Sequence, residues 1–116
     1  HRGDASNYVE NTLEAFKSAK SLGYHYIETD LRETKDGKVI TFHDKNLKRI
    51  TGSNVTINRS NLSDIRMRRL PKNESIPTLD ELLEELPDSF FNMDLKVPNM
   101  EEKVLKLLTL FFFQVC

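Results

Sequence analysis

The sequence predicts an α/β fold in which helices alternate with the strands of a parallel sheet. Three segments have the apolar periodicity of amphipathic helices, and three β-rich segments lie between them. This alternation is typical of βαβ units, which build parallel sheets. The chain has 116 residues, of which 38% are hydrophobic, enough for one modest domain with a core. We therefore expect α/β structure throughout residues 1–116.

The three predicted helices begin with the same local signal. Asn or Thr at the first position is followed three residues later by Glu, as in a capping box whose side chains satisfy free backbone N–H groups. The helices span about Asn11–Leu22, Thr78–Leu86 and a segment that opens at Asn99. Gly23 and Pro87 follow the first two, and both residue types end helices.

The strand-like segments are short and rich in β-branched or aromatic residues. They are Tyr24–Leu31, Val39–Phe42 and Phe90–Val97. The Asp36-Gly37 pair predicts a turn before the second segment. Residues 1–3 are placed at the end of an earlier strand. Residues 44–75 are polar, with one short helix expected near 63–69.

Charge and composition argue against several classes of protein. The 17 basic and 18 acidic side chains leave a net charge of −1, so bulk electrostatics favours neither nucleic acid nor an anionic membrane as a partner. The one cysteine, Cys116, allows no intrachain disulfide and no Cys-based zinc site, which favours a cytoplasmic setting. The longest apolar run, Leu107–Phe113 broken by Thr109, is far shorter than the roughly 20 residues that cross a membrane.

Polar residues gather where the predicted strands end. Glu28 and Asp30 are two positions apart and share one face of a strand, and Asp94 and Lys96 repeat this spacing. In a (β/α) barrel, the carboxyl ends of the strands meet at one mouth. The further residues expected at this mouth are His1, Arg2, His43 and Asp44.

These residue types suit phosphoryl transfer. Two neighbouring carboxylates repel each other unless a positive charge lies between them. Three hard oxygen ligands suit Mg²⁺ or Ca²⁺ better than zinc. Arg and Lys side chains can hold phosphate oxygens, and two histidines can act as general acid and general base near neutral pH.

Each of these signals has a plainer interpretation when taken singly. Glu28 and Asp30 alone are more often solvated, and Asp94 with Lys96 is more often a surface ion pair. His25, on the alternate face of its strand, is interpreted as an ordinary histidine. The other basic residues interpreted as a solvated surface are Arg32, Lys35, Lys38, Lys45, Lys48, Arg66, Arg68 and Arg69.

Six motifs carry a family resemblance. They are His1-Arg2-Gly3, Glu10-Asn11-Thr12, Glu28-Thr29-Asp30, "TKDG", "HDKNLKRITG" and "IPTLDELL". In this order, from residue 1 to about 108, they resemble the N-terminal part of the glycerophosphodiester phosphodiesterase family. The resemblance implies a TIM-type barrel of the PLC-like phosphodiesterases. It also implies metal-dependent hydrolysis of glycerophosphodiesters to glycerol 3-phosphate and an alcohol, in glycerophospholipid metabolism.

The resemblance implies a role for each matching residue. It assigns acid/base catalysis to His1 and His43, phosphate binding to Arg2 and Lys96, and ligation of one Mg²⁺ or Ca²⁺ to Glu28, Asp30 and Asp94. The family's third ligand is commonly Glu in a Glu-x-Lys motif. Here the motif is Asp94-Leu95-Lys96, whose carboxylate has a shorter reach.

The length of the chain leaves alternatives open. A (β/α)₈ barrel takes roughly 250 residues, so 116 residues supply about the first three βα units and an incomplete domain is expected. Either the sequence is cropped or the product is truncated, and the opening residue, His1, implies residues before it. The alternatives to a glycerophosphodiesterase are a lysophospholipase D, acting on lysophospholipids, and a non-catalytic remnant of the family.

Overall fold

A computed structural model describes residues 2–68 and 70–115 of the chain. Its elements, in chain order, are α1 (Leu13–Ser21), β1 (Tyr26–Glu33), β2 (Val39–Thr41), α2 (Lys48–Thr51), the 3₁₀ turn η1 (Ile57–Arg59), α3 (Leu62–Arg66), the 3₁₀ turn η2 (Pro71–Asn73), α4 (Leu79–Glu85), β3 (Phe90–Leu95) and α5 (Glu101–Val115). The predicted order of helices and strands is confirmed from α1 onward, whereas residues 2 and 3, which were placed at the end of an earlier strand, lie in a turn. The short turns α2, η1 and η2 were not predicted, because none has a long enough apolar repeat.

The sheet has the order β2-β1-β3, with β1 in the centre. β1 and β3 are parallel, whereas β1 and β2 are antiparallel. The parallel pair is thus formed by the two strands that a helix separates, and β2 is added to it by a turn. Only residues 34–38 connect β1 to β2, and a parallel pair needs a crossover of about a dozen residues or more. Gly37, with φ of 79°, makes this tight turn possible.

Helix α1 begins one residue later than the sequence predicts. Thr12 is the N-cap, and its side chain accepts a hydrogen bond from the backbone N–H of Ala15. Asn11 has φ of 58° and is not the cap, because an N-cap residue has extended backbone angles. Gly3 passes so close to this helix that a Cβ atom there would lie 2.8 Å from the carbonyl carbon of Ala15.

The other two predicted helix starts have different outcomes. Thr78 caps α4 and forms the predicted capping box with Glu81. Asn99 does not cap α5, because its φ of 68° is left-handed and not extended, and the helix begins two residues later, at Glu101. The local pattern of Asn or Thr followed by Glu therefore identified one cap correctly out of three.

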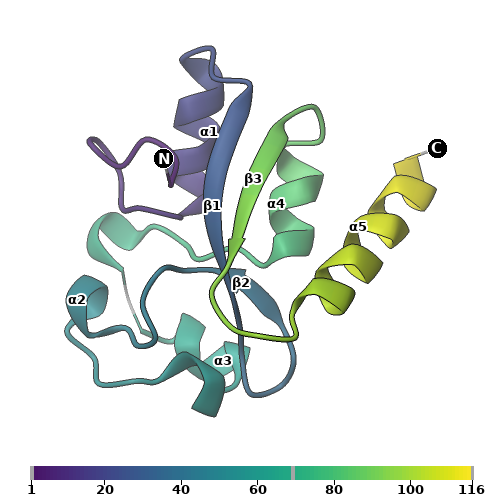
Figure 1. Cartoon of the computed structure of the whole chain (residues 1–116). Helices are drawn as coiled ribbons and strands as arrows, with labels where there is room; N and C mark the ends of the chain where they lie inside the picture. Colours follow the sequence, from purple (N-terminus) through teal and green to yellow (C-terminus); the bar gives the residue numbers. More distant parts are fainter. Residues whose placement is uncertain (1, 69, 116) are drawn as a thin grey trace.

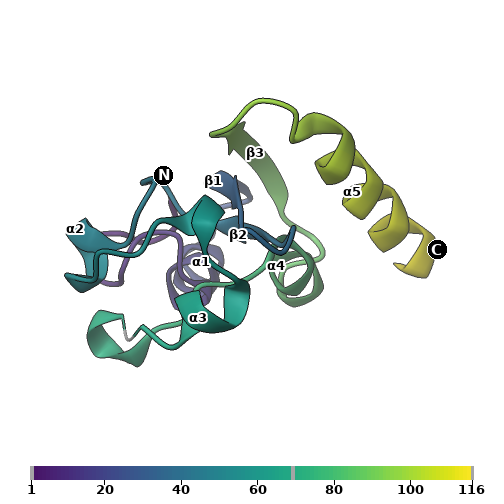
Figure 2. The ribbon, with the colours of Figure 1, turned by 90° about the horizontal axis from the view of Figure 1, so that it is seen from below.

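The helices cover one side of the sheet. Figures 1 and 2 show α1 and α4 beside each other behind the strands, with α5 outermost beyond β3. Ile27 of β1 packs with Phe16 of α1 and Leu82 of α4, and a second apolar cluster joins β1 and β2 to α4 and the start of α5. A third apolar cluster forms the core of the segment between β2 and α4.

The polar face of β1 is also buried. Asp30 is 1% exposed and Arg32 is 8% exposed, although both point away from the apolar cluster that contains Ile27. A buried charge is tolerated only when it is paired or hydrogen-bonded. The partners of these two residues therefore define the part of the molecule with unusual electrostatics.

None of the helices in residues 2–68 and 70–115 is long and apolar enough to span a bilayer.

Candidate active site

The parallel pairing of β1 and β3 brings the predicted acidic residues to one face of the sheet. Asp30 lies opposite Asp94 in the strand register, and Glu28 lies two positions earlier on β1. Lys96 follows β3, and its backbone N–H donates to the carbonyl of Leu31. Residues more than 60 positions apart in the sequence are therefore adjacent at the carboxyl ends of these two strands.

Asp30 is the buried centre of this group. Its Oδ2 lies 3.1 Å from Nε of Arg2 and accepts a hydrogen bond of 3.0 Å from Nδ2 of Asn11. Its Oδ1 lies 3.4 Å from Nζ of Lys96, which is also 2.6 Å from Oδ2 of Asp94. The bond to Asp94, with the charge of Asp30, raises the pKa of Lys96 above its usual value. Two cations thus compensate one buried carboxylate.

Arg2 is held in an uncommon backbone conformation. Its φ is 54°, a left-handed value that non-glycine residues rarely adopt. Its N–H donates to the carbonyl of Glu28, and its own carbonyl accepts from the N–H of Asn11. The Nε atom is buried and close to Asp30, but its orientation is that of an ion pair and not of a hydrogen bond. Backbone strain of this kind is concentrated at functional sites.

An arginine that sequence reasoning did not single out links two parts of the group. The guanidinium of Arg49 forms a two-bond contact with Glu10, at 2.9 Å and 2.8 Å. It also donates to Asp44, at 2.8 Å and 3.1 Å. Asp44 in turn lies 2.8 Å from Nδ1 of His43, and Glu10 lies 3.2 Å from Arg2. A continuous chain of charges therefore connects Arg2 to His43.

The pKa values of the two carboxyls follow from these contacts. The Arg49 guanidinium lowers the pKa of Glu10, against the opposing effect of its partial burial. Hydrogen bonds from Arg49 and then from His43 lower the pKa of Asp44 to about 2. Both carboxyls are therefore ionised throughout the neutral range, and hydrogen bonds between charged groups are stronger than those between neutral ones.

Arg32 is not a solvated residue, which corrects the interpretation from the sequence. It is 8% exposed, and its Nε and Nη2 donate to the backbone carbonyl of His43 at 2.8 Å and 2.6 Å. Burial lowers the pKa of Arg32 from its usual value. The side chain thus fixes the backbone of His43 to β1, while the chain Glu10–Arg49–Asp44 holds its ring.

The comparison with known proteins decides the family. Residues 1–108 match the Glycerophosphoryl diester phosphodiesterase family. The chain belongs to this family. A crystal structure of a glycerophosphodiester phosphodiesterase from Thermotoga maritima is 38% identical to it, with a TM-score of 0.84 over 92% of this chain and 46% of that one. The solved structures of this family are (β/α)₈ barrels, and the chain is a partial α/β fragment that corresponds to about half of the length of such a structure.

Two further relatives bear on chemistry. A phosphodiesterase from Oleispira antarctica, solved in complex with the product sn-glycerol-3-phosphate, is 27% identical with a TM-score of 0.83, over 98% of this chain and 50% of that one. Lysophospholipase D GDPD1 from Homo sapiens is 38% identical over 85% of this chain and 36% of its own length. The chain spans half or less of the length of each of these proteins.

The family resemblance places His1 at this site, but His1 lies outside the described residues. His25 is exposed and lies just before β1 begins. His43 is partly exposed, with its ring next to Asp44. The structure therefore brings Arg2, Asp30 and Lys96 together and connects His43 to them through side chains.

The three predicted metal ligands have the donor chemistry of a divalent-cation site. Glu28, Asp30 and Asp94 offer the hard carboxylate oxygens that Mg²⁺ and Ca²⁺ prefer, and β1 and β3 present them on one face. Within residues 2–68 and 70–115, no three acidic or histidine side chains are gathered closely enough to hold a metal. The ammonium of Lys96 contacts both Asp30 and Asp94, so an ion bound between these two would replace that contact.

The loop that carries Glu10 and Asn11 is fixed by a distant acid that sequence reasoning missed. Glu74 is 8% exposed and accepts hydrogen bonds from the N–H of Val9, at 2.7 Å, and from Oγ1 of Thr12, at 3.1 Å. Asn11 then bonds to Asp30 and accepts from Oγ1 of Thr29. The Glu10-Asn11-Thr12 motif was a signal for this loop, whereas nothing in the sequence pairs it with Glu74.

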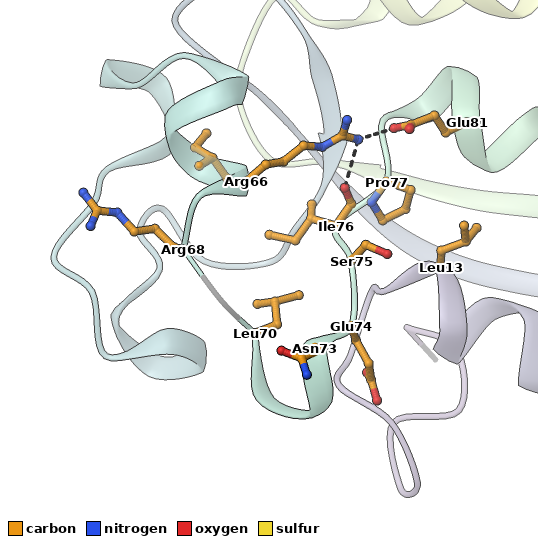
Figure 3. A pocket seen from close by; sticks show the side chains of 11 residues that line it. Leu13, Arg66, Arg68, Leu70, Asn73, Glu74, Ser75, Ile76, Pro77 and Glu81 are labelled. Atoms are coloured by element: carbon orange, nitrogen blue, oxygen red, sulfur yellow. Dashed lines mark hydrogen bonds and ion pairs between the residues drawn. The ribbon is translucent and has the colours of Figure 1, made fainter.

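A separate cavity of about 400 Å³ lies away from this site. Figure 3 shows its lining, which comes mainly from residues 65–77 together with Leu13 and Glu81. Arg66 crosses one edge, where it donates to the carbonyl of Ile76 at 3.2 Å and pairs with Glu81. None of the described residues predicted to act on substrate lines this cavity, so the candidate active site remains at the ends of β1 and β3.

Proposed function

We propose that the full-length protein hydrolyses glycerophosphodiesters to glycerol 3-phosphate and an alcohol. The observation that carries the proposal is the convergence of Arg2 and Lys96 on the buried Asp30, in a chain of contacts that reaches His43. Membership of the family and the glycerol 3-phosphate complex of the Oleispira antarctica neighbour support the same substrate class.

Arg2 and Lys96 are the proposed phosphate-binding residues. Both are mostly covered, with side chains 20% and 22% exposed, so their charges are weakly screened by water. A guanidinium can hold two phosphate oxygens, and an ammonium acts as a compact charge. Negative charge that develops on the phosphate during reaction is stabilised where these two groups converge.

The net charge of the cluster supports a requirement for a metal ion. Glu28, Asp30 and Asp94 bring three negative charges, and Arg2 and Lys96 bring two positive ones. The cluster alone is therefore negative by one charge and repels an anionic phosphodiester, whereas a divalent cation reverses the sign. Glu28, Asp30 and Asp94 would hold Mg²⁺ or Ca²⁺, which supplies Lewis-acid stabilisation of the phosphate when bound.

Two histidines divide the proton transfers in this proposal. One takes the proton of the attacking hydroxyl, and the other protonates the departing alcohol. The glycerol hydroxyl next to the ester is already within reach of phosphorus, so its attack is intramolecular and gains from proximity. The product of this step is a cyclic phosphate, which water opens with the roles of His1 and His43 reversed.

A lysophospholipase D activity is the second candidate, because the relative from Homo sapiens carries that name at 38% identity. The two activities break the same kind of phosphodiester bond but differ in whether the glycerol carries an acyl chain. Product analysis separates them when the full-length protein is given glycerophosphocholine or lysophosphatidylcholine. Release of glycerol 3-phosphate from glycerophosphocholine supports the proposal. Release of lysophosphatidic acid from lysophosphatidylcholine, without cleavage of glycerophosphocholine, supports the alternative.

The same experiment tests metal dependence and the non-catalytic alternative. Exhaustive chelation should abolish turnover, and added Mg²⁺ or Ca²⁺ should restore it. If turnover survives chelation, the assignment of Glu28, Asp30 and Asp94 as metal ligands is refuted. Failure of the purified, folded protein to cleave either substrate with any divalent cation overturns the enzymatic proposal and leaves the non-catalytic interpretation.

A further inference from the structure

The side chain of Arg49 makes more contacts than is usual for a residue that is half exposed. Its side chain is 49% exposed, and an exposed ion pair ordinarily contributes little stability. Nevertheless the guanidinium forms two hydrogen bonds to Glu10 and two to Asp44, which lie 34 residues apart along the chain. Planar two-bond contacts of this kind fix geometry as well as charge.

The two carboxylates connected by Arg49 belong to different parts of the site. Glu10 also contacts Arg2, the proposed phosphate-binding arginine, at 3.2 Å. Asp44 contacts Nδ1 of His43 at 2.8 Å. The side chain of Arg49 joins Glu10 directly to Asp44. The orientation of the His43 ring is therefore tied to the segment that carries Arg2.

We propose that Arg49 is a positioning residue, which sets the orientation of the His43 ring by holding Asp44 against the Glu10–Arg2 pair. This inference rests on the proposed function, because it takes His43 as an acid/base residue. Arg49 is not one of the residues proposed to bind the phosphate or to transfer protons. Its effect on the reaction passes through Asp44.

Arg49 and His43 both contact the carboxylate of Asp44. The charged groups around His43 are Asp44 at its ring, Arg32 at its carbonyl, and Glu10 and Arg49 beyond Asp44. When the arginine is removed, Asp44 loses the partner that holds it, and its contact with the His43 ring is no longer fixed.

The test compares Arg49→Gln and Arg49→Lys with the control Arg59→Gln in the full-length protein. Arg59 is exposed on η1 and has no ion pair within the described residues. We expect Arg49→Gln to lower kcat about 10- to 100-fold, as loss of an orienting partner typically does, with a smaller change in KM. Lysine should restore little of this loss, because one ammonium cannot form two planar contacts. Arg59→Gln should leave both constants unchanged.

Two further measurements separate positioning from general damage. The NMR titration of the His43 ring should differ between Arg49→Gln and the wild type, and the limb of the kcat/KM profile that depends on His43 should change with it. In a Glu10→Gln background, Arg49→Gln should cost less than it does alone, because the anchor of the guanidinium is already lost. Thermal unfolding checks that each variant is folded. If Arg49→Gln does not fold, Arg49→Lys carries the same measurements.

The possible failures are distinguishable. Wild-type protein without diesterase activity overturns the proposed function, and the ring titration still shows whether Arg49 acts on His43. If the wild type is active and His43→Gln is impaired, an unchanged kcat and an unchanged ring midpoint in the Arg49 variants overturn the positioning role. Equal losses in Arg49→Gln and Arg59→Gln overturn it as well.

Discussion

Replacing Asp30 by Asn in the metal-free protein separates two opposing electrostatic effects. Asp30 shares one face of β1 with Glu28, so repulsion between like charges alone predicts that the substitution stabilises the fold. In the structure, however, Asp30 contacts the side chains of Arg2 and Lys96. The substitution removes the carboxylate that both cations share, and we expect this loss to dominate.

The size of the expected loss in the free energy of unfolding follows from the burial of these three side chains. The side chain of Asp30 is 2% exposed, and those of Arg2 and Lys96 are 20% and 22% exposed. Removing one member of a buried ion pair costs about 3–5 kcal/mol. Arg2 keeps its contact with Glu10 and Lys96 keeps its contact with Asp94, so the lower end applies. We expect the free energy of unfolding to fall by about 3 kcal/mol.

Asp94→Asn is the matched control for this prediction. Asp94 lies opposite Asp30 in the strand register and also contacts Lys96, but its side chain is 56% exposed, so its loss should cost about 0–1 kcal/mol. Urea unfolding of both full-length variants, in excess chelator, gives the two free energies from midpoints at equal slope. A stabilised Asp30→Asn protein, or equal losses in the two variants, refutes the reasoning.

Four other outcomes are expected. Arg32→Gln should lower the free energy of unfolding by about 1.5–3 kcal/mol in urea, because the His43 carbonyl loses two charged donors, whereas exposed Lys35→Gln should change it little. In steady-state assays, His43→Gln should reduce kcat/KM about 10²–10⁴-fold and His25→Gln should not; equal losses would contradict the assignment of proton transfer to His43. Because the pKa of Asp44 is lowered to about 2, its ionised form stabilises the fold above the usual carboxyl range, and this contribution is lost as the pH falls from about 4 through about 2. The loss should be under about 1 kcal/mol, since Asp44 is partly exposed, and unfolding curves of Asp44→Asn should lack it. Finally, a substrate without the hydroxyl next to the ester should be inert if a cyclic phosphate forms, and its normal turnover would identify direct attack by water.

The residues with local partners were predictable from the sequence. The capping box of α4 joins residues three positions apart, and the shared face of Glu28 and Asp30 follows from the two-residue repeat of a strand. The ordered motifs also identified the family before any fold was known. In each case the deciding interaction, or the matching pattern, is contained in a few consecutive residues.

The same local signals failed where a distant contact was stronger. Asn11 has the residue type and spacing of an N-cap, yet it adopts a left-handed backbone and bonds to Asp30, 19 positions away. Arg32 resembles its solvated neighbours in a basic segment, but the antiparallel turn to β2 brings the carbonyl of His43 within its reach. A cap contributes about 1 kcal/mol, which burial and pairing of a charge readily outweigh.

The sequence by itself determined the order of elements, the acidic face of β1 and the family to which the chain belongs. The tertiary structure decided which charges meet. Arg49 and Glu10 are 39 residues apart, and Glu74 lies 65 residues from Val9, so no periodic pattern or motif spacing records either pair. Such contacts depend on how the loops pack against the sheet. Their energies are set by burial and geometry, which exist only once the chain has folded.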